Sequence, residues 1–210
     1  MEKILETVRK SLREAEKSLE EITAAIAAFA IQKVELASLH PGETFKIGEH
    51  DFIVLKQEDG QTKVISKEFM AKNVKFDDES RDYNVSSIKQ LIENDIQPII
   101  EAAVGAENII EHSVDLTSVD MQSEFCAVTC KVRPITFDEA REFNELIVNK
   151  ELDDWWCTCT PWSTEERGWK YSLAVVRPSG LICNFDGFFN CFGVRPVCIL
   201  KSNIFVSKGE

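Results

Sequence analysis

The sequence has little of what marks an exported, membrane-spanning or nucleic-acid-binding protein. No apolar run approaches the length of a membrane span, and the opening Met1-Glu2-Lys3-Ile4-Leu5-Glu6 carries charges where a secretory signal needs an apolar stretch. Lysine and arginine total 24 against 36 acidic residues, a net charge of −12, without a dense basic run. Nucleic acids and anionic membranes select cationic faces, so we expect neither as a partner. We expect synthesis in the cytoplasm without a signal peptide, and no membrane span.

Residues that commonly build catalytic or metal sites are few and scattered. The three histidines, His40, His50 and His112, have no cysteine or aspartate at the spacing of a metal site or a catalytic pair. The run Asp77-Asp78-Glu79 lacks the alternating spacing and the glycine of a calcium loop. We therefore expect no catalytic residue, no metal and no cofactor, and we expect that the protein is not an enzyme.

The cysteines number seven, and an odd count does not suit a complete disulfide framework. We expect reduced thiols that are not needed for folding. No second ligand pair at zinc spacing accompanies Cys126 and Cys130, and the spacing of Cys157 and Cys159 is wrong for the usual redox or zinc motif. Cysteines placed on strands are therefore favoured over a metal or redox pair. The other three are Cys183, Cys191 and Cys198.

The length of 210 residues suits one sizeable domain with an appendage, and the appendage is an N-terminal helix. Its apolar residues recur at alternating steps of four and three, as in a coiled-coil seam, and no proline or glycine precedes Pro41. We predict a coiled-coil stem over residues 1–38 that self-associates through residues 5–36. The alternative is a single amphipathic helix folded back on its own domain, whose stripe is usually wider. From Ala24 to Ala30 the helix is apolar all round, which places this end against the globular domain or a partner subunit. The seam residues are Leu5, Val8, Leu12, Ala15, Leu19, Ile22, Ile26, Phe29 and Leu36.

The rest of the chain, residues 40–210, reads as one domain of α+β class, since strands and helices follow one another without regular alternation. Asp59-Gly60 is a hairpin turn signal, and Thr136-Phe137-Asp138-Glu139 is a capping box that opens a helix through about residue 149. Another helix is expected from Asn84 to Val104, with a kink or break at Pro98 and Gly105 as its stop. The expected strands are residues 44–47, 52–55, 63–66, 113–116, 127–132, 175–180 and 194–200.

The segment from Cys183 to Phe192 combines four phenylalanines with Asn, Asp and Gly, and neither a strand nor a helix period runs through it. The adjacent Phe188 and Phe189 cannot both point inward from one strand. We predict that this segment forms one exposed surface together with Cys157 and Cys159, because an exposed aromatic patch usually marks a binding site. The alternative is that these phenylalanines are ordinary core. Trp155 is expected to be a buried framework aromatic, and Arg195 a guanidinium that fixes loop carbonyls.

Several motifs in order resemble one family. Trp155-Trp156 with Thr160-Pro161, Val176-Arg177-Pro178-Ser179-Gly180 and Gly193-Val194-Arg195-Pro196 are similar to C-type-lectin-like domains of phage and prophage proteins from gut Firmicutes. Some of these are variable proteins of diversity-generating retroelements. The run from Phe45 to Leu55, Ile65-Ser66-Lys67 and Asp82-Tyr83-Asn84 resemble the family's opening hairpin and the turn before its helix, so the resemblance covers residues 40–206.

The resemblance implies a C-type lectin fold whose late loops and strands are diversified for ligand binding. It further implies a protein or carbohydrate ligand on a host-cell surface, a virion component as one destination, and a trimer as the first choice of oligomer, followed by a dimer. With the aromatic segment it gives a ligand-binding set of Trp156, Cys157, Cys159, Tyr171, Asn184, Phe185, Asp186, Phe188, Phe189, Asn190 and Phe192.

Two other functions stay open at this point. An intracellular interaction or inhibitor protein agrees with the acidity and the free thiols. An enzyme related to formylglycine-generating enzymes, which use a similar fold, ranks lower because their catalytic patterns are not recognisable in this sequence.

Overall fold

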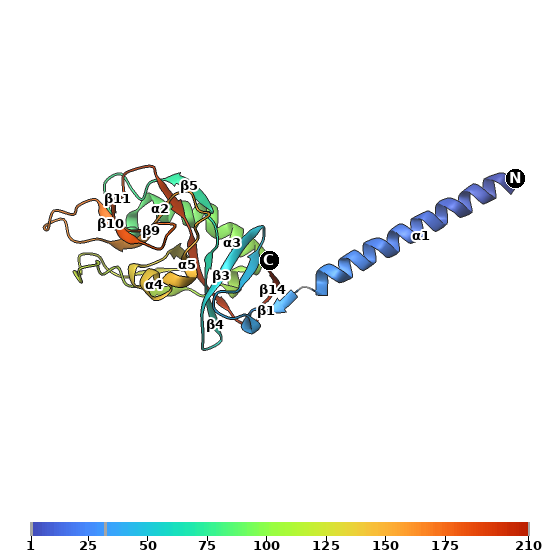
Figure 1. Cartoon of the computed structure of the whole chain (residues 1–210), viewed down its shortest axis with the longest axis horizontal. Coiled ribbons are helices and arrows are strands. Elements are labelled where there is room, and N and C mark those ends of the chain that lie inside the picture. Colours follow the sequence, from blue (N-terminus) through green and yellow to red (C-terminus); the bar gives the residue numbers. More distant parts are fainter. Residues whose placement is uncertain (1, 32, 210) are drawn as a thin grey trace. The chain divides into compact units, whose positions relative to one another are not determined.

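The structure is a computed structural model that describes the backbone of residues 2–31 and 33–209 and the side chains of residues 6–23 and 33–209 (Figure 1). The chain divides into two units, one up to Val34 and one from Glu35 onward, which are described separately. The mixed α+β class is confirmed: one long helix precedes a unit of short helices and mostly antiparallel sheets.

The first unit is built on helix α1 (Glu2–Ile31), as the unbroken heptad pattern predicts. Its apolar stripe is exposed in the single chain, including Val8, Leu12, Leu19 and Ile22. The predicted seam residues Leu5, Ile26 and Phe29, with the apolar stretch Ala24–Ala30, lie outside the described side chains.

Leu36, predicted as the last seam residue, is instead a core residue of the globular unit. It lies in the short helix η1 (Leu36–Ser38), is fully buried, and donates its backbone N–H to the carbonyl of Ile204 at 2.8 Å. The heptad spacing continued past the point where the helix ends, so spacing alone could not show this change.

The larger sheet has the strand order β1-β14-β2-β3-β4-β13-β8. Asp59 and Gly60 both adopt positive φ, 50° and 74°, which is the geometry of the tight turn that joins β3 to β4. The three predicted strands at 44–47, 52–55 and 63–66 are confirmed. The bounds are β1 Lys33–Glu35, β2 Thr44–Ile47, β3 His50–Glu58, β4 Gln61–Ser66, β8 Val132–Pro134, β13 Pro196–Lys201 and β14 Phe205–Lys208.

The helix predicted from Asn84 to Val104 is present in several pieces. After η2 (Tyr83–Val85), Ser86 caps α2 (Ser87–Leu91), which passes through a π-turn, η3 (Ile92–Ile96), into α3 (Gln97–Val104). Pro98 has no N–H to donate and its ring clashes with the carbonyl four residues earlier, so the widened turn directly before it relieves both problems. The helix ends at Gly105, which has a φ of 87°. A further short helix, η4 (Ala106–Asn108), follows.

The capping box on Thr136 and Glu139 is confirmed, with both of its hydrogen bonds present. It opens α4 (Phe137–Glu142), which breaks at Phe143 before α5 (Asn144–Ile147), so the single predicted helix is two short ones.

The smaller sheet has the order β11-β10-β9-β12-β5, and β12 runs parallel to β9. Four predicted strand assignments change. The strand predicted at 175–180 is β10 (Ser172–Val176), which ends at Val176, and the strand predicted at 127–132 is two strands, β7 (Val128–Cys130) and β8, in different sheets. The other two changes concern the C-terminal part of the chain. The segment predicted to lack a regular period contains a strand, β11, and the single strand predicted at 194–200 is two strands, β12 and β13, which belong to different sheets on either side of Arg195. The bounds are β5 Ala71–Val74, β9 Trp155–Pro161, β10 Ser172–Val176, β11 Ile182–Asp186 and β12 Phe192–Val194; β6 (His112–Val114) and β7 (Val128–Cys130) form a separate pair.

Arg195 ties the two sheets together at this crossing. It is buried, donates Nε to the carbonyl of Ser66 at 2.9 Å and Nη1 to the carbonyl of Ile147 at 2.6 Å, and lies over the ring of Trp156 at 4.7 Å. Burial lowers the pKa of Arg195 to about 10, which still leaves the guanidinium charged at neutral pH. The framework role predicted for Arg195 is confirmed. The surrounding core includes Ile53, Leu55, Ile65, Ala140, Val176 and Val197.

Candidate functional site

Four aromatic side chains at the end of the smaller sheet form a continuous cluster, which we call the aromatic surface: Tyr171, Phe185, Phe188 and Phe189. Tyr171, Phe188 and Phe189 are 39%, 38% and 46% exposed, and Phe185 is half-buried. Ring centroids lie 4.4 Å apart for Phe188 and Phe189, and 5.4 Å apart both for Tyr171 and Phe188 and for Phe185 and Phe189. These four predicted site residues are therefore neighbours in space.

The turn after β11 holds Phe188 and Phe189 outward. Gly187 donates its N–H to the carbonyl of Tyr171 at 2.8 Å and accepts from the N–H of Phe76 at 2.7 Å. A Cβ at this position would lie 2.7 Å from a methyl group of Leu173, so only glycine fits without a shift. The prediction that at least one of the two phenylalanines faces outward or lies in a loop is confirmed for both.

The aromatic surface rests on a packed base. Phe185 meets Trp155 at 5.1 Å and the buried Phe192 at 6.0 Å, both edge to face, and the Arg177 guanidinium lies 4.1 Å over the Trp155 ring. Edge-to-face aromatic pairs and guanidinium stacking each add stability beyond the apolar area that they bury. The exposed rings are thus supported from below.

Four residues predicted for the exposed surface are buried instead: Trp156, Cys157, Cys159 and Phe192. Strand β9 is the middle strand of the smaller sheet and is covered on both faces, so alternation along the strand does not bring Trp156, Cys157 or Cys159 to the surface. The roles predicted for the tryptophan pair are reversed: Trp155, expected in the core, is half-buried, whereas Trp156 packs with Phe69 and Arg195.

Burial also makes the thiols of β9 chemically inert. It raises the pKa of Cys159 to about 12 and raises that of Cys157 further. Neither side chain is a thiolate at neutral pH, so neither serves as a nucleophile or a ready metal ligand. Among the described residues, no three His, Cys, Asp or Glu side chains gather as a metal site.

The polar residues predicted beside the phenylalanines do not all lie on the same face of the sheet. Asn184 and Asp186 alternate with Phe185 along β11 and so point to the opposite face, where Asp186 accepts from the Ser172 hydroxyl at 2.5 Å. Asn190 is exposed at the end of the turn. The polar groups beside the aromatic surface are therefore the Tyr171 hydroxyl, Asn190 and Lys170, without Asn184 or Asp186.

Sequence reasoning missed Trp169. It is 38% exposed, packs on Trp162 with ring centroids 6.5 Å apart, and precedes Lys170, whose ammonium lies 5.6 Å over the Tyr171 ring. The signal that could have found it is a tryptophan placed directly after the polar run Glu165-Glu166-Arg167-Gly168, where a large aromatic residue is unexpected.

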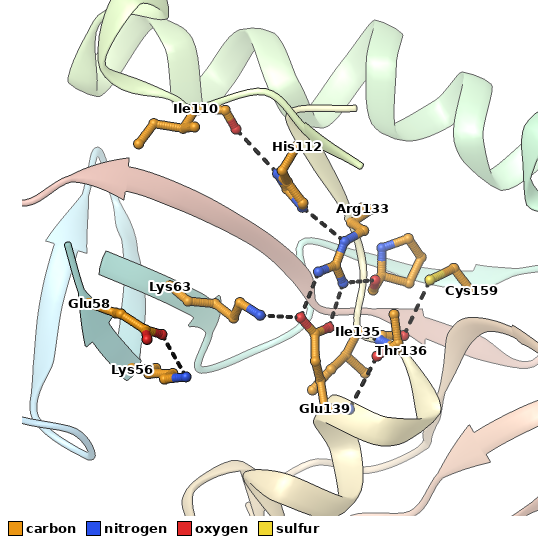
Figure 2. A network of polar contacts seen from close by, with 11 residues as sticks. Lys56, Glu58, Lys63, Ile110, His112, Arg133, Ile135, Thr136, Glu139 and Cys159 are labelled. Carbon is orange, nitrogen blue, oxygen red and sulfur yellow. Dashed lines mark hydrogen bonds and ion pairs between the residues drawn. The ribbon is translucent and has the colours of Figure 1, made fainter. Parts of the chain in front are cut away.

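Sequence reasoning also missed a buried charge network around Glu139 (Figure 2). Its carboxylate accepts from both terminal nitrogens of Arg133 at 2.6 and 2.7 Å, from Lys63 at 2.5 Å, and from the backbone N–H of Thr136 at 3.0 Å. Burial alone would raise the pKa of Glu139, but the bonds and charges of Arg133 and Lys63 outweigh it and hold that pKa well below its usual range.

The same network fixes the state of His112. Arg133 can only donate, so its Nε, 3.1 Å from His112 Nε2, requires a lone pair there, and the proton is on Nδ1, 3.2 Å from the carbonyl of Ile110. Burial and the charge of Arg133 lower the pKa of His112, so the ring is neutral at pH 7. A cleft of about 460 Å³ opens beside this network.

Comparison with known proteins found no match among family models, curated proteins or solved structures. Of the described helices, none is both long and apolar enough to cross a membrane.

Proposed function

We propose that this protein is a non-enzymatic ligand-binding protein that presents the aromatic surface on a C-type-lectin-like scaffold. The observation that carries this proposal is the pair Phe188 and Phe189, held outward on a turn where only a glycine at position 187 fits without a shift of its neighbours. Large apolar rings exposed on a rigid base are typical of recognition surfaces, where aromatic residues supply contact area at little conformational cost.

The chemistry of the surface favours a protein over a carbohydrate ligand. A sugar needs polar side chains beside the aromatic ring, and Asn184 and Asp186 lie on the other face of β11. An apolar partner patch that excludes water over the rings needs no such groups. We propose a protein on a host-cell surface as the ligand, with the chain acting as a phage or prophage receptor-binding component and as a variable protein of a diversity-generating retroelement.

The stem supports this function if it joins several copies. The exposed stripe of α1 is a seam that a second or third copy can cover, and we propose a trimer, with a dimer as the next choice. Several weak sites on one stem then bind a surface far more tightly than one site does.

Cell-binding measurements test the proposal. Fluorescently labelled full-length protein is applied to a panel of gut Firmicutes strains, and binding is read by flow cytometry. The double variant Phe188→Ser/Phe189→Ser is expected to lose the binding, whereas Phe205→Ser, an exposed phenylalanine on another sheet, is expected to retain it. Equal binding by wild type and the double variant would contradict the proposal. A nearby reverse-transcriptase gene with a near-copy of the segment encoding residues 155–200 would support diversification.

A further inference from the structure

The cleft beside the buried network is built from different elements than the aromatic surface. The cleft is lined by residues of β6 and the loop after it, by the start of α4, and by Lys63 and Arg133. Lys63 and Arg133 both contact Glu139 (Figure 2). The volume of about 460 Å³ falls within the range of small-molecule sites. These segments are far apart in sequence, so the cleft exists only in the folded chain.

The network beside the cleft has a surplus of positive charge, although the lining as a whole holds as many acids as cations: Asp115, Asp138 and Glu139 against Lys63, Arg133 and Arg141. Arg133 and Lys63 share the single carboxylate of Glu139, and His112 is neutral, so the group carries a net charge of +1. Glu58, at the end of the neighbouring strand β3, is paired with Lys56 at 2.7 Å. Because two cations share one carboxylate, one positive charge of the network is not balanced within it, and an anion that enters the cleft would balance that charge.

The donors left over at the cleft are cationic. The ammonium of Lys63 has three N–H groups, gives one to Glu139, and belongs to a side chain that is 24% exposed. Arg141 also lines the cleft, and its ion pair with Asp138 is long, 3.7 Å. By contrast, the carboxylate of Asp115 is engaged by its own loop, through the N–H and hydroxyl of Thr117 at 2.8 and 2.7 Å.

The rim supplies apolar contacts. The Phe137 ring lies under the Arg141 guanidinium at 5.4 Å. Met121 lines the same cleft, is 77% exposed, and has a φ of 63°. A non-glycine residue in the left-handed region is strained, and such strain tends to occur at binding sites.

We propose that this cleft binds a small organic anion, with its carboxylate or phosphate group against Lys63 and Arg141 and its carbon skeleton against Phe137 and Met121. The site is independent of the aromatic surface, so it stands or fails separately from the proposed function.

The test is a titration of the full chain with citrate, with inorganic phosphate and with neutral xylitol, followed by calorimetry and by backbone amide NMR. Saturable binding of at least one anion is expected, with shifts confined to residues 112–121 and 133–141, and none with xylitol. Arg141→Gln, at an exposed rim position, is expected to weaken binding about tenfold, as loss of a charged hydrogen bond does. Ser113→Glu adds a negative charge at an exposed position that lines the cleft, and this variant is expected to lose anion binding.

The matched control is Lys201→Gln, which removes an exposed lysine that does not line the cleft. It is expected to bind like the wild type. If it weakens binding as much as Arg141→Gln does, the anions respond to diffuse charge and the proposal is wrong. The absence of saturable binding by either anion up to about 10 mM, a range that covers weak millimolar affinity, would also overturn it. Lys63→Gln is informative only where its thermal melt shows a folded protein, and it is then expected to bind at least tenfold more weakly than wild type.

Discussion

Truncating phenylalanines one at a time separates the aromatic surface from the core beneath it. Phe189 is 46% exposed, whereas Phe192, which follows it by three positions, is fully buried. Burying a whole phenylalanine side chain stabilises a protein by about 1.5–3 kcal/mol, so a ring that keeps about half its area in water contributes roughly half of that. Phe189→Ala is therefore expected to lower the free energy of unfolding by about 1 kcal/mol.

Phe192→Ala removes a ring with no exposed area and leaves a cavity against Phe185. Large-to-small changes of this kind cost about 3–5 kcal/mol, because the lost transfer term and the cavity term add. The two variants therefore differ by about 2–4 kcal/mol. Such a gap is well above the error of a denaturant midpoint.

The assay is urea unfolding followed by tryptophan fluorescence, at one fixed protein concentration because self-association shifts apparent stability. Unchanged slopes in both variants would show that the midpoints report stability. If Phe189→Ala costs as much as Phe192→Ala, the ring packs as core and the aromatic surface is not a surface. If Phe192→Ala costs about 1 kcal/mol or less, the base on which the surface rests is not packed.

Three further predictions concern the network, the stem and the thiols. Glu139→Gln leaves Arg133 buried without its counter-charge and is expected to lower the free energy of unfolding in urea by about 3–5 kcal/mol. Because the folded state lowers the pKa of Glu139, the stability that its carboxylate contributes is present above the ordinary carboxyl pKa of 4.5 and is lost as pH falls below that value. Wild type should therefore lose stability more steeply than the variant between pH 5 and 3, and parallel curves would contradict this. Deletion of residues 1–34 is expected to give a monomer by light scattering while the full chain associates at micromolar concentration, and a monomeric full chain would refute the stem assignment. Iodoacetamide is expected to alkylate the exposed Cys126 in the native protein but Cys159 only after unfolding, since Cys159 is buried and its pKa is raised to about 12. If mass spectrometry finds both cysteines labelled at equal rates in the native protein, the packing of β9 is contradicted.

Features set by neighbouring residues were predictable from the sequence. The Asp59-Gly60 turn, the capping box on Thr136 and the helix stop at Gly105 each depend on a few adjacent residues, and each is present. The interruption at Pro98 was predicted as a kink or break, and the form that it takes, a π-turn, follows from how the helix accommodates a missing donor.

Features set by strand pairing were not predictable. Trp155 and Trp156 point to opposite faces of β9 by simple alternation, but which face meets the main core depends on the pairing of β9 with β10 and β12. The charge network has the same origin. Lys63, Arg133 and Glu139 come together because β13 lies between β4 and β8, and nothing local at Glu139 beyond its capping role indicated a buried arginine.

The packing also limits how this surface can change. Diversification of the segment from Cys183 to Phe192, which the proposed function includes, is constrained at two positions. A Cβ at Gly187 would require the Leu173 side chain to shift, and the buried Phe192 needs an apolar replacement. Phe188, Phe189 and Asn190 are exposed, so they can change at small cost to the fold. The same turn that holds two phenylalanines outward would hold other side chains there, since its backbone hydrogen bonds to Tyr171 and Phe76 do not involve the varied side chains. Under the proposed function, the residues that fix the shape of the turn would therefore be distinct from those that select the ligand.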